Sequence, residues 1–341
     1  MVIPPLDGLQ LIEGSAFVAA PSGGMTLAQL GADVIRFDQI GGGLDHKRWP
    51  LTDAGDSIYW AGLNKGKRSI QVDLRSPAAR ELLTELIARA GNFLTNFPPR
   101  GWMAPHTLRE RRTDLVMLAV MGNRDGSTAL DYTVNCALGY PAATGPVGDD
   151  TPVNHVLPAW DLVCGQTAAL GILAADRHRF RTGEGATMSL ALSDVALAAV
   201  AALGHIGEAQ VNGTQRERFG NDLYGAYGRD FVTADGERVY AVGISPKQWS
   251  SLLEATDAVE AVDDIAAAGG YDFRDEGDRF RARDEIGAVI APWIAARPLA
   301  EVAARFDELG VCWGRYQTFL ELVAEDPRVR PEAGLFREVE Q

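Results

Sequence analysis

The sequence is poor in the residues that build metal centres and disulfide frameworks. Its 341 residues include five histidines and three cysteines, Cys136, Cys164 and Cys312. The cysteines are odd in number and widely spaced, and no histidine pair has the spacing of a metal-binding motif. We therefore expect no bound metal and no disulfide framework, and a reducing cytoplasm is the expected compartment.

Positive charge and long apolar runs are also scarce. Lysine and arginine number 32 against 46 acidic residues, so the formal net charge is −14. An anionic surface argues against nucleic acid or an acidic membrane as the main partner. No window of about 20 residues is apolar enough for a membrane helix, and MVIPPLDGLQ lacks the features of a signal peptide. The expectation is a soluble cytoplasmic protein without a membrane or nucleic-acid partner.

The first part of the chain alternates strand-like and helix-like segments. Apolar runs such as LQLIEG and DVIRFD predict strands, and SPAARELLTELIARA predicts a helix that begins at Ser76 and Pro77. Strands joined by helical crossovers predict a mostly parallel sheet, and ligands bind such sheets at the carboxyl ends of the strands. The predicted fold class is therefore α/β, with a doubly wound large domain and a smaller α+β domain.

The composition changes near residue 206. Residues 206–226 are rich in glycine, asparagine and arginine, which predicts a connector or an active-site loop. FVTADGERVYAVGI then predicts a hairpin that turns at Asp235-Gly236, and helical patterns follow it. These changes place the large domain at residues 1–205 and the small domain at residues 227–330.

One acid, Asp161, stands in an apolar run near the start of a helix predicted over residues 158–180. It can simply stabilise the helix through its interaction with the positive end of the helix dipole, which contributes about 0.3–1 kcal/mol. Alternatively, the helix start holds the carboxylate ionised while apolar neighbours remove its water, which suits attack on an activated acyl group. Both interpretations stay open from the residues alone. His155 and Cys164, which lie close to Asp161 in the sequence, are expected to have structural roles.

Two cationic stretches, HKRW and NKGKRS, stand out in an acidic chain. Either they are solvated loops or they bind a phosphorylated ligand. NFPPRG ends a predicted strand, which is the expected place for a ligand loop. The sequence GGMTLAQLGADVIRFD lacks the G-x-G-x-x-G spacing, so nicotinamide dinucleotide binding is disfavoured.

Taken in order, these stretches resemble the family III CoA-transferases (CaiB/BaiF type), a group that includes formyl-CoA transferase and α-methylacyl-CoA racemase. The matching blocks are LDGLQLIEGSAFVAAPSGGMTLAQLGADVIRFD, LNKGKRSIQVDL, FLTNFPPRG and WDLVCGQTAALGILAADRHRFRTGEGATMSLALSDVAL. The resemblance implies a Rossmann-like large domain, two chains interlocked as a homodimer, and coenzyme A as part of the substrate rather than a permanent cofactor.

The resemblance also assigns roles to residues. Asp161 takes the position of the family's acyl-accepting aspartate. The residues at positions where relatives contact coenzyme A are Phe17, Val18, Ala19, Lys65, Lys67, Arg68, Asn96, Phe97, Arg100 and Tyr132.

Within the family, EGSAFVAAP, GGGLDHKRWP and YWAGLNKGKRS are most similar to members that move CoA between the two carboxyl groups of one unsaturated C5 diacid. Such members serve the 3-hydroxypropionate cycle of carbon fixation. The alternatives are an intermolecular CoA-transferase, a racemase and a catalytically disabled CoA-binding protein. The racemase mechanism needs a histidine just before Asp131, where this chain has Leu130.

The chain departs from the family pattern in two places. Relatives carry an arginine after the acid at Asp38, where this chain has Gln39. Either one cationic contact to the nucleotide is absent, or His46, Lys47 or Arg48 replaces it. Relatives also continue beyond EVEQ. Residues 331–341 are therefore expected to start a segment that returns to the large domain and is cut short.

Overall fold

The computed structural model describes residues 3–334, and these form two compact units. Unit 1 comprises the chain up to Ala143 together with Pro152–Arg216, and unit 2 comprises Thr144–Thr151 together with the chain from Glu217 onward. Among the residues described, no single helix is long and apolar enough to cross a membrane. Two bent pairs of helices, within 192–212 and 283–309, reach that length and composition only together.

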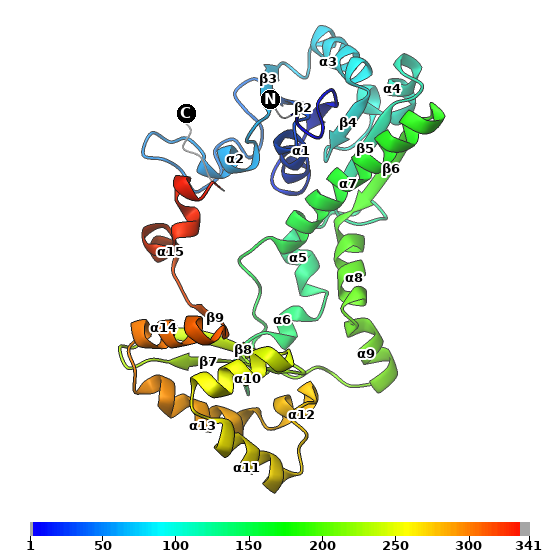
Figure 1. Cartoon of the computed structure of the whole chain (residues 1–341). Coiled ribbons are helices and arrows are strands. Elements are labelled where there is room, and N and C mark those ends of the chain that lie inside the picture. Colours follow the sequence, from blue (N-terminus) through cyan, green and yellow to red (C-terminus); the bar gives the residue numbers. More distant parts are fainter. Residues whose placement is uncertain (1–2, 335–341) are drawn as a thin grey trace. The chain divides into compact units, whose positions relative to one another are not determined.

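Unit 1 is built on a six-stranded sheet (Figure 1). Its strands are β1 (Gln10–Gly14), β2 (Asp33–Gln39), β3 (Arg68–Val72), β4 (Asn92–Thr95), β5 (Val116–Met121) and β6 (Ala186–Ala191). All adjacent pairs are parallel, in the order β3-β2-β1-β4-β5-β6. This is the strand order of the doubly wound Rossmann fold, in which strands are added outward from β1 on one side and from β4 on the other, so that the order switches between these two strands. The predicted α/β class and parallel sheet are confirmed.

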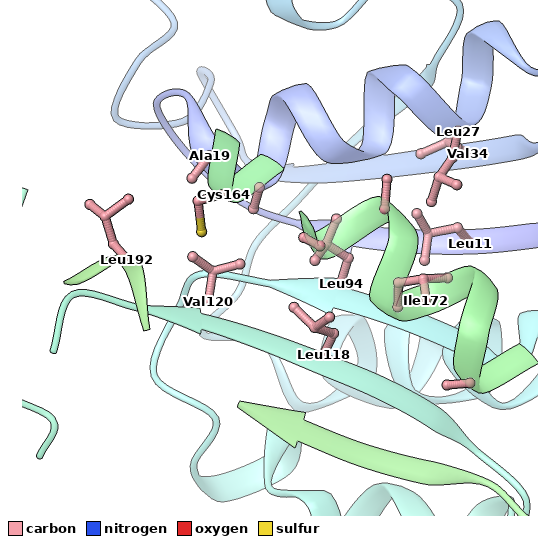
Figure 2. Close-up of a cluster of buried hydrophobic side chains, with 14 of the residues drawn as sticks. Leu11, Ala19, Leu27, Val34, Leu94, Leu118, Val120, Cys164, Ile172 and Leu192 are labelled. Carbon is pink, nitrogen blue, oxygen red and sulfur yellow. The ribbon is translucent and has the colours of Figure 1, made fainter. Parts of the chain in front are cut away.

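Helices occupy both faces of this sheet. Those of unit 1 are α1 (Ala19–Gln29), α2 (Ile58–Leu63), α3 (Pro77–Ala90), α4 (Pro105–Arg111), α5 (Asp131–Cys136), α6 (Tyr140–Ala143), α7 (Ala159–Thr182), α8 (Leu192–Ala202) and α9 (His205–Asn212), with a short 3-10 turn η1 (Gly101–Met103). Side chains alternate between the faces along each strand, so Leu11 packs with α1 and α7 whereas Ile12 packs with α3 and α4. Figure 2 shows Cys164 and Ile172 of α7 beside the strand residues of the first face.

Helix α7 follows from its sequence. Pro158 precedes the helix, and Gly183 ends it in the left-handed conformation with φ 77°. Its buried positions carry mostly small residues, which lets the backbone approach α1 closely. A Cβ added at Gly23 of α1 would lie 2.8 Å from the carbonyl oxygen of Gly165 of α7. The two helices therefore meet backbone to backbone near the start of each.

Unit 2 contains a three-stranded antiparallel sheet in the order β7-β8-β9, with β7 (Tyr227–Val232), β8 (Arg238–Gly243) and β9 (Cys312–Arg315). Its helices are α10 (Pro246–Ala255), α11 (Val259–Gly269), α12 (Glu276–Arg281), α13 (Arg283–Ala295), α14 (Leu299–Leu309) and α15 (Phe319–Glu325), followed by the 3-10 turns η2 (Pro327–Val329) and η3 (Pro331–Ala333). The hairpin turns at Asp235 and Gly236 as predicted, with Gly236 at φ 83°.

Some local predictions differ from the structure. The alanine-rich pattern of residues 191–209 favours one continuous helix, but α8 and α9 are separate because Gly204 takes φ 80° between them. Helix α9 also fills the first part of the expected connector 206–226, and irregular chain follows it. Of the expected return segment 331–341, the described part forms η3, and residues 335–341 lie outside the described residues.

Candidate active site

The reversal point of the sheet brings together two segments that were predicted to contact coenzyme A. Asn96 follows β4, and its amide nitrogen donates to the carbonyl oxygen of Ala16 at 2.7 Å. Its amide oxygen accepts from the backbone N–H of Ala16 at 3.0 Å. This pair of bonds ties the loop after β1, which contains Phe17 and Val18, to the loop after β4, which contains Asn96 and Phe97. Ligands of such sheets bind at this position.

Phe17 holds an uncommon backbone conformation, with φ 67° in the left-handed region. Its N–H donates to the carboxylate of Asp45 at 2.8 Å, and Asp45 is itself paired with the buried Arg36 at 2.9 Å. The N–H of Phe17 is therefore engaged within the protein. The ring is partly exposed and lies 5.9 Å from the guanidinium of Arg48. The strained loop thus presents an aromatic side chain rather than a backbone donor.

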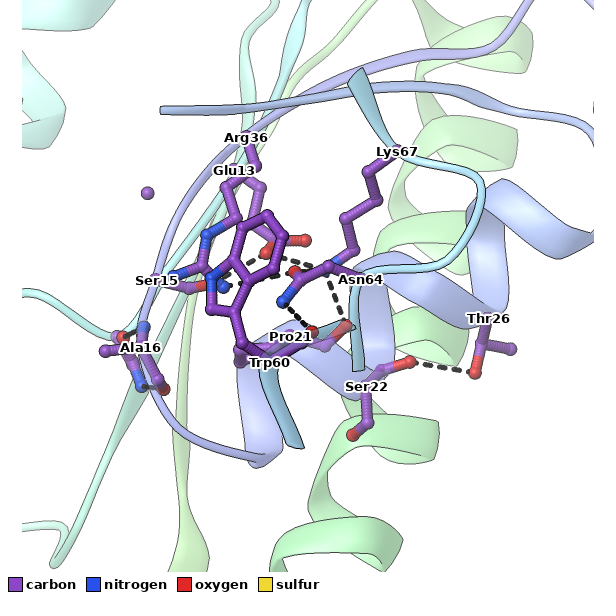
Figure 3. A network of polar contacts seen from close by, with 12 residues as sticks. Glu13, Ser15, Ala16, Pro21, Ser22, Thr26, Arg36, Trp60, Asn64 and Lys67 are labelled. Carbon is purple, nitrogen blue, oxygen red and sulfur yellow. Dashed lines mark hydrogen bonds and ion pairs between the residues drawn. The ribbon is translucent and has the colours of Figure 1, made fainter. Parts of the chain in front are cut away.

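The ammonium group of Lys67 lies in a buried polar network (Figure 3). It donates to Glu13, to the carbonyl oxygen of Pro21 and to the amide oxygen of Asn64, each at 2.8 Å. The side chains of Lys67 and Glu13 are 1% and 0% exposed, and burial lowers the pKa of Lys67. All three donors of the ammonium are used, so this arrangement favours a structural role for Lys67, which ties α1 to β1.

The other predicted cations lie in different surroundings. Arg68 begins β3 and pairs with Asp33, which begins β2, so this pair stands at the amino edge of the sheet. Ligands of such folds bind at the opposite edge, and the placement favours a structural role for Arg68 as well. Lys65 and Arg100 are exposed and form no ion pair within residues 3–334. These two cations are therefore available to an anionic ligand.

Asp161 lies in the first turn of α7, but a different acid caps that helix. The buried carboxylate of Asp131, on α5, accepts the N–H of Trp160 at 2.7 Å and the N–H of Asp161 at 3.0 Å. Its second oxygen lies 2.7 Å from Nε2 of His155. The side chain of Asp161 accepts no hydrogen bond from any residue in the described part of the chain. The predicted acid therefore stands without a donor of its own beside a capped helix end.

These surroundings raise the pKa of Asp161 to about 7, first through burial and second through the negative charge of Asp131. Asp131 occupies N–H groups at the helix start, so burial and the charge of Asp131 outweigh the stabilisation of the Asp161 anion that the helix start was expected to give. A carboxylate of this basicity is a stronger nucleophile than an ordinary aspartate. Burial also raises the pKa of Cys164 to about 12, with Asp161 contributing, so that thiol is unreactive and packs in the core.

The packing of α7 on α1 places the helical turn that follows Asp161 against the start of α1. Asp161 lies one helical turn before Gly165 and therefore shares its face of the helix. A Cβ added at Gly165 would lie 2.6 Å from the carbonyl oxygen of Ala19 and 3.1 Å from the nitrogen of Gly23. The start of α7, which contains Asp161, therefore packs near the start of α1, where the predicted CoA-contact residue Ala19 lies.

Arg48 and Tyr59 also belong to this region, and sequence reasoning did not single out Tyr59. Tyr59 of α2 has its pKa raised, first by burial, while the positive charge of Arg48 lowers it and the negative charge of Asp161 raises it. The guanidinium of Arg48 lies 5.1 Å from the centroid of the Tyr59 ring. Tyr59 occurs in the stretch YWAGLNKGKRS, so the resemblance marked the segment but gave no role to its tyrosine.

Tyr132 stands on α5 next to the capping acid. Its ring is partly exposed and lies edge-on to the ring of His155, with centroids 6.0 Å apart. Through His155 and Asp131 the tyrosine is connected to the start of α7. Asp131 and His155 were not predicted as site residues, and an acid opening a short helix is a weak signal in a single sequence. Within residues 3–334 no cluster of three or more histidine, cysteine or acidic side chains could hold a metal ion.

Comparison with known proteins agrees with these features. A model of the family described as CoA-transferase family III matches residues 6–341. The 2-methylfumaryl-CoA isomerase of Chloroflexus aurantiacus is 55% identical, across 98% of this chain and 83% of that protein. A succinyl-CoA:mesaconate CoA-transferase of Haloarcula hispanica is 31% identical, across 85% of this chain and 75% of that protein. The crystal structure of a CAIB/BAIF family protein from Brucella suis has the same fold, with a TM-score of 0.77, 24% identity, and coverage of 95% and 86%.

Proposed function

The chain belongs to CoA-transferase family III, and on that premise we propose that it moves coenzyme A between the two carboxyl groups of one mesaconate molecule. This is the activity of a 2-methylfumaryl-CoA isomerase, the relative with 55% identity across 98% of the chain. The observation that carries the proposal is the state of Asp161, a desolvated carboxylate of raised pKa beside the sheet position where ligands bind.

The proposed reaction begins with attack of the Asp161 carboxylate on the C1 thioester carbonyl. The carbon–sulfur bond breaks, CoA leaves as a thiolate, and Asp161 and the diacid form a mixed anhydride. The thiolate then attacks the Asp161 carbonyl, which gives an aspartyl-CoA thioester and frees the C1 carboxylate. The C4 carboxylate attacks that thioester, CoA thiolate leaves again, and its attack at C4 of the new anhydride releases the isomeric thioester and the Asp161 carboxylate.

The surroundings of Asp161 suit each of these steps. The free carboxylate is the only form of Asp161 that carries the disfavoured buried charge, whereas its anhydride and its thioester are neutral. Burial and the charge of Asp131 therefore destabilise the starting anion relative to both covalent intermediates. We propose the backbone N–H groups at the start of α1, those of Val18 and Ala19, as donors to the oxyanions, because the turn of α7 after Asp161 packs against Ala19.

We place coenzyme A along the carboxyl edge of the sheet. The proposed contacts are Phe17, Val18, Ala19, Lys65, Asn96, Phe97, Arg100 and Tyr132. Lys67 and Arg68 are kept out of this set because their cations are engaged with Glu13 and Asp33. CoA enters as part of the substrate, and two chains are proposed to act as a homodimer, as the family resemblance implies.

Transfer within one molecule requires that the mesaconate stay bound while CoA is on Asp161. A well-placed carboxylate then reacts with an effective concentration of about 10⁵ M or more, which exceeds any free acid at millimolar concentration. Exchange is measured by adding isotopically labelled free mesaconate during isomerisation. We expect the thioester pool to stay unlabelled over many turnovers. Rapid labelling would replace the isomerase proposal with an intermolecular CoA-transferase.

The role of Asp161 is tested separately by substitution. Asp161→Ala should abolish isomerisation and leave the binding of CoA, measured by calorimetry, nearly unchanged. Asp194→Ala removes another first-turn aspartate, at the start of α8, and should retain activity. Substantial turnover by the Asp161→Ala variant would remove the basis of the mechanism.

A further inference from the structure

Resting on the proposed function, we infer that Arg48 binds the free carboxylate of the acyl group and so restricts the enzyme to thioesters of dicarboxylic acids. A diacid monothioester keeps one ionised carboxylate, which must be held close to Asp161 during transfer. Arg48 is the cation whose position, lack of an ion-pair partner and rigid support match that requirement.

Arg48 forms no ion pair with any carboxylate among residues 3–334. The nearby Arg36 makes a useful contrast, because it is fully buried and pairs with both Asp38 and Asp45. Arg48 is exposed, and its guanidinium lies over two aromatic rings instead. A side-chain hydrogen bond from Arg48 contributes to the pKa of Tyr59, and the remaining N–H groups along the edge of the guanidinium can donate to a carboxylate.

The backbone of Arg48 is held in place at several points. Its N–H donates to the carbonyl oxygen of Asp45 at 3.1 Å, and its own carbonyl oxygen accepts from the hydroxyl of Ser57. Asp45 also holds the N–H of Phe17, so one buried acid positions both the arginine and one of its aromatic supports. The Phe17 and Tyr59 rings, 5.9 and 5.1 Å from the guanidinium, limit where the side chain can go. Such support lowers the entropy lost when a ligand is bound.

The position of Arg48 corresponds to the reacting end of the substrate. The charges of Arg48 and Asp161 both shift the pKa of Tyr59, so both groups are close enough to this ring to act on it. Phe17, the second ring against Arg48, lies two residues before Ala19, against which the α7 turn that follows Asp161 packs. A carboxylate bound to Arg48 would therefore lie beside the carbonyl that Asp161 attacks. This placement favours the acyl carboxylate over the phosphates of CoA as the anion that Arg48 binds.

The geometry of the guanidinium also suits the proposed chemistry. Two parallel N–H donors match a planar carboxylate, and they can hold either carboxylate of mesaconate in turn as CoA moves between C1 and C4. When one carboxyl is bound as a thioester or anhydride, the other is the anion that Arg48 holds. A neutral acyl group of the same shape would leave the guanidinium without this partner.

The test compares two thioesters in the full-length protein. One is mesaconyl-C1-CoA, and the other carries a methyl ester on the free carboxyl. Formation of free acid and of the aspartyl-CoA adduct is followed in a single turnover by mass spectrometry, because this half-reaction needs no second carboxylate.

Arg48→Met keeps the length of the side chain but removes its charge, and Arg48→Lys keeps the charge without the planar fork. Arg181→Met is the matched control, since Arg181 is exposed in the last turn of α7, about 30 Å along the helix from Asp161.

We expect wild-type protein and the Arg181→Met control to prefer the diacid thioester by about 10- to 100-fold, the range for a lost charge-assisted hydrogen-bonding partner. Arg48→Met should remove most of that preference by slowing the diacid only, and Arg48→Lys should restore part of it. Equal slowing of both thioesters, or a dependence on the 3′-phosphate when dephospho-CoA thioesters are used, would assign Arg48 to CoA and overturn the inference. Unchanged preference in Arg48→Met would overturn it too. Wild-type protein that forms no adduct with either thioester would instead contradict the proposed function.

Discussion

The contact between α1 and α7 makes a quantitative prediction at Gly165. A methyl group at this position would lie 1.9 Å from the hydroxyl oxygen of Ser22 and 2.6 Å from the carbonyl oxygen of Ala19. The hydroxyl can rotate away, but the carbonyl belongs to the backbone of α1. An ordinary contact begins at 3.4 Å, so the helices must separate locally by about 0.8 Å in Gly165→Ala.

This separation has two measurable consequences. Overpacking costs about 1–3 kcal/mol, reduced by up to about 1 kcal/mol because alanine favours a helix over glycine. Asp161 lies one turn away on the same face and moves with the helix relative to Val18 and Ala19. A misplacement near 1 Å can lower a rate by about 100-fold, so we expect kcat to fall by about 10- to 100-fold with a modest loss of stability.

The assay separates the two mesaconyl-CoA isomers by chromatography, and thermal unfolding followed by circular dichroism reports stability. Gly171→Ala is the matched control on the same helix, because its methyl would meet only the end of the Leu118 side chain, at 2.9 Å. The control should keep kcat within about twofold of wild type, since a leucine end can shift cheaply. Wild-type kcat in Gly165→Ala, or equal losses in both variants, would refute the claim that this contact positions Asp161.

The remaining predictions concern charge. The pKa of Asp161 is raised to about 7, and its anion is the proposed nucleophile, so kcat/KM should rise with pH through about 7. Asp131→Asn should move this rise to lower pH, and an unmoved rise would contradict the electrostatic coupling between the two acids. A raised carboxyl pKa means that the folded protein loses stability as pH rises from about 4 to about 7. Asp161→Asn should therefore raise the midpoint of thermal unfolding at about pH 8 but not at about pH 4. A variant with the wild-type midpoint at about pH 8 would argue against a buried anion. Lys67→Met should destabilise the fold by about 3–5 kcal/mol, because it leaves the Glu13 carboxylate buried without its cation. Lys65→Met should raise KM for the thioester without changing the midpoint of thermal unfolding. A loss of stability in Lys65→Met with a raised KM in Lys67→Met would exchange the roles of the two lysines.

The parallel sheet was predictable because its evidence is local. Strands such as β1 and β2 are short apolar runs bounded by turn residues, and α3 has proline at its first turn and a left-handed glycine, Gly91, at its end. Strand β6 was missed because its burial alternates, and its sequence ATMSLA carries no apolar run. The break between α8 and α9 depends on the backbone angle of one glycine, which the surrounding alanine-rich pattern hides.

The proposed nucleophile could be chosen from the sequence and the resemblance, whereas its electrostatic surroundings could not. Asp161 stands out as a lone acid in an apolar helix, so the residue was found from the sequence together with the resemblance. The ionisation state was not, because it depends on Asp131, which reaches the start of α7 from a different helix. Lys67 likewise looked like a phosphate ligand in the sequence, and only the fold shows its three internal partners. The ionisation of Asp161 and the role of Lys67 both depend on contacts between residues far apart in the chain, and a single sequence does not reveal such contacts.

The most direct measurement is the mass of the Asp161 peptide after the protein meets its thioester. Protein incubated with mesaconyl-CoA is trapped with borohydride or hydroxylamine and then digested. The account predicts that the peptide containing Asp161 changes in mass, to the alcohol with borohydride or to the hydroxamate with hydroxylamine, and that Asp161→Asn protein shows no such change. An unmodified Asp161 peptide from protein that is turning over, or modification at another carboxylate, would contradict it.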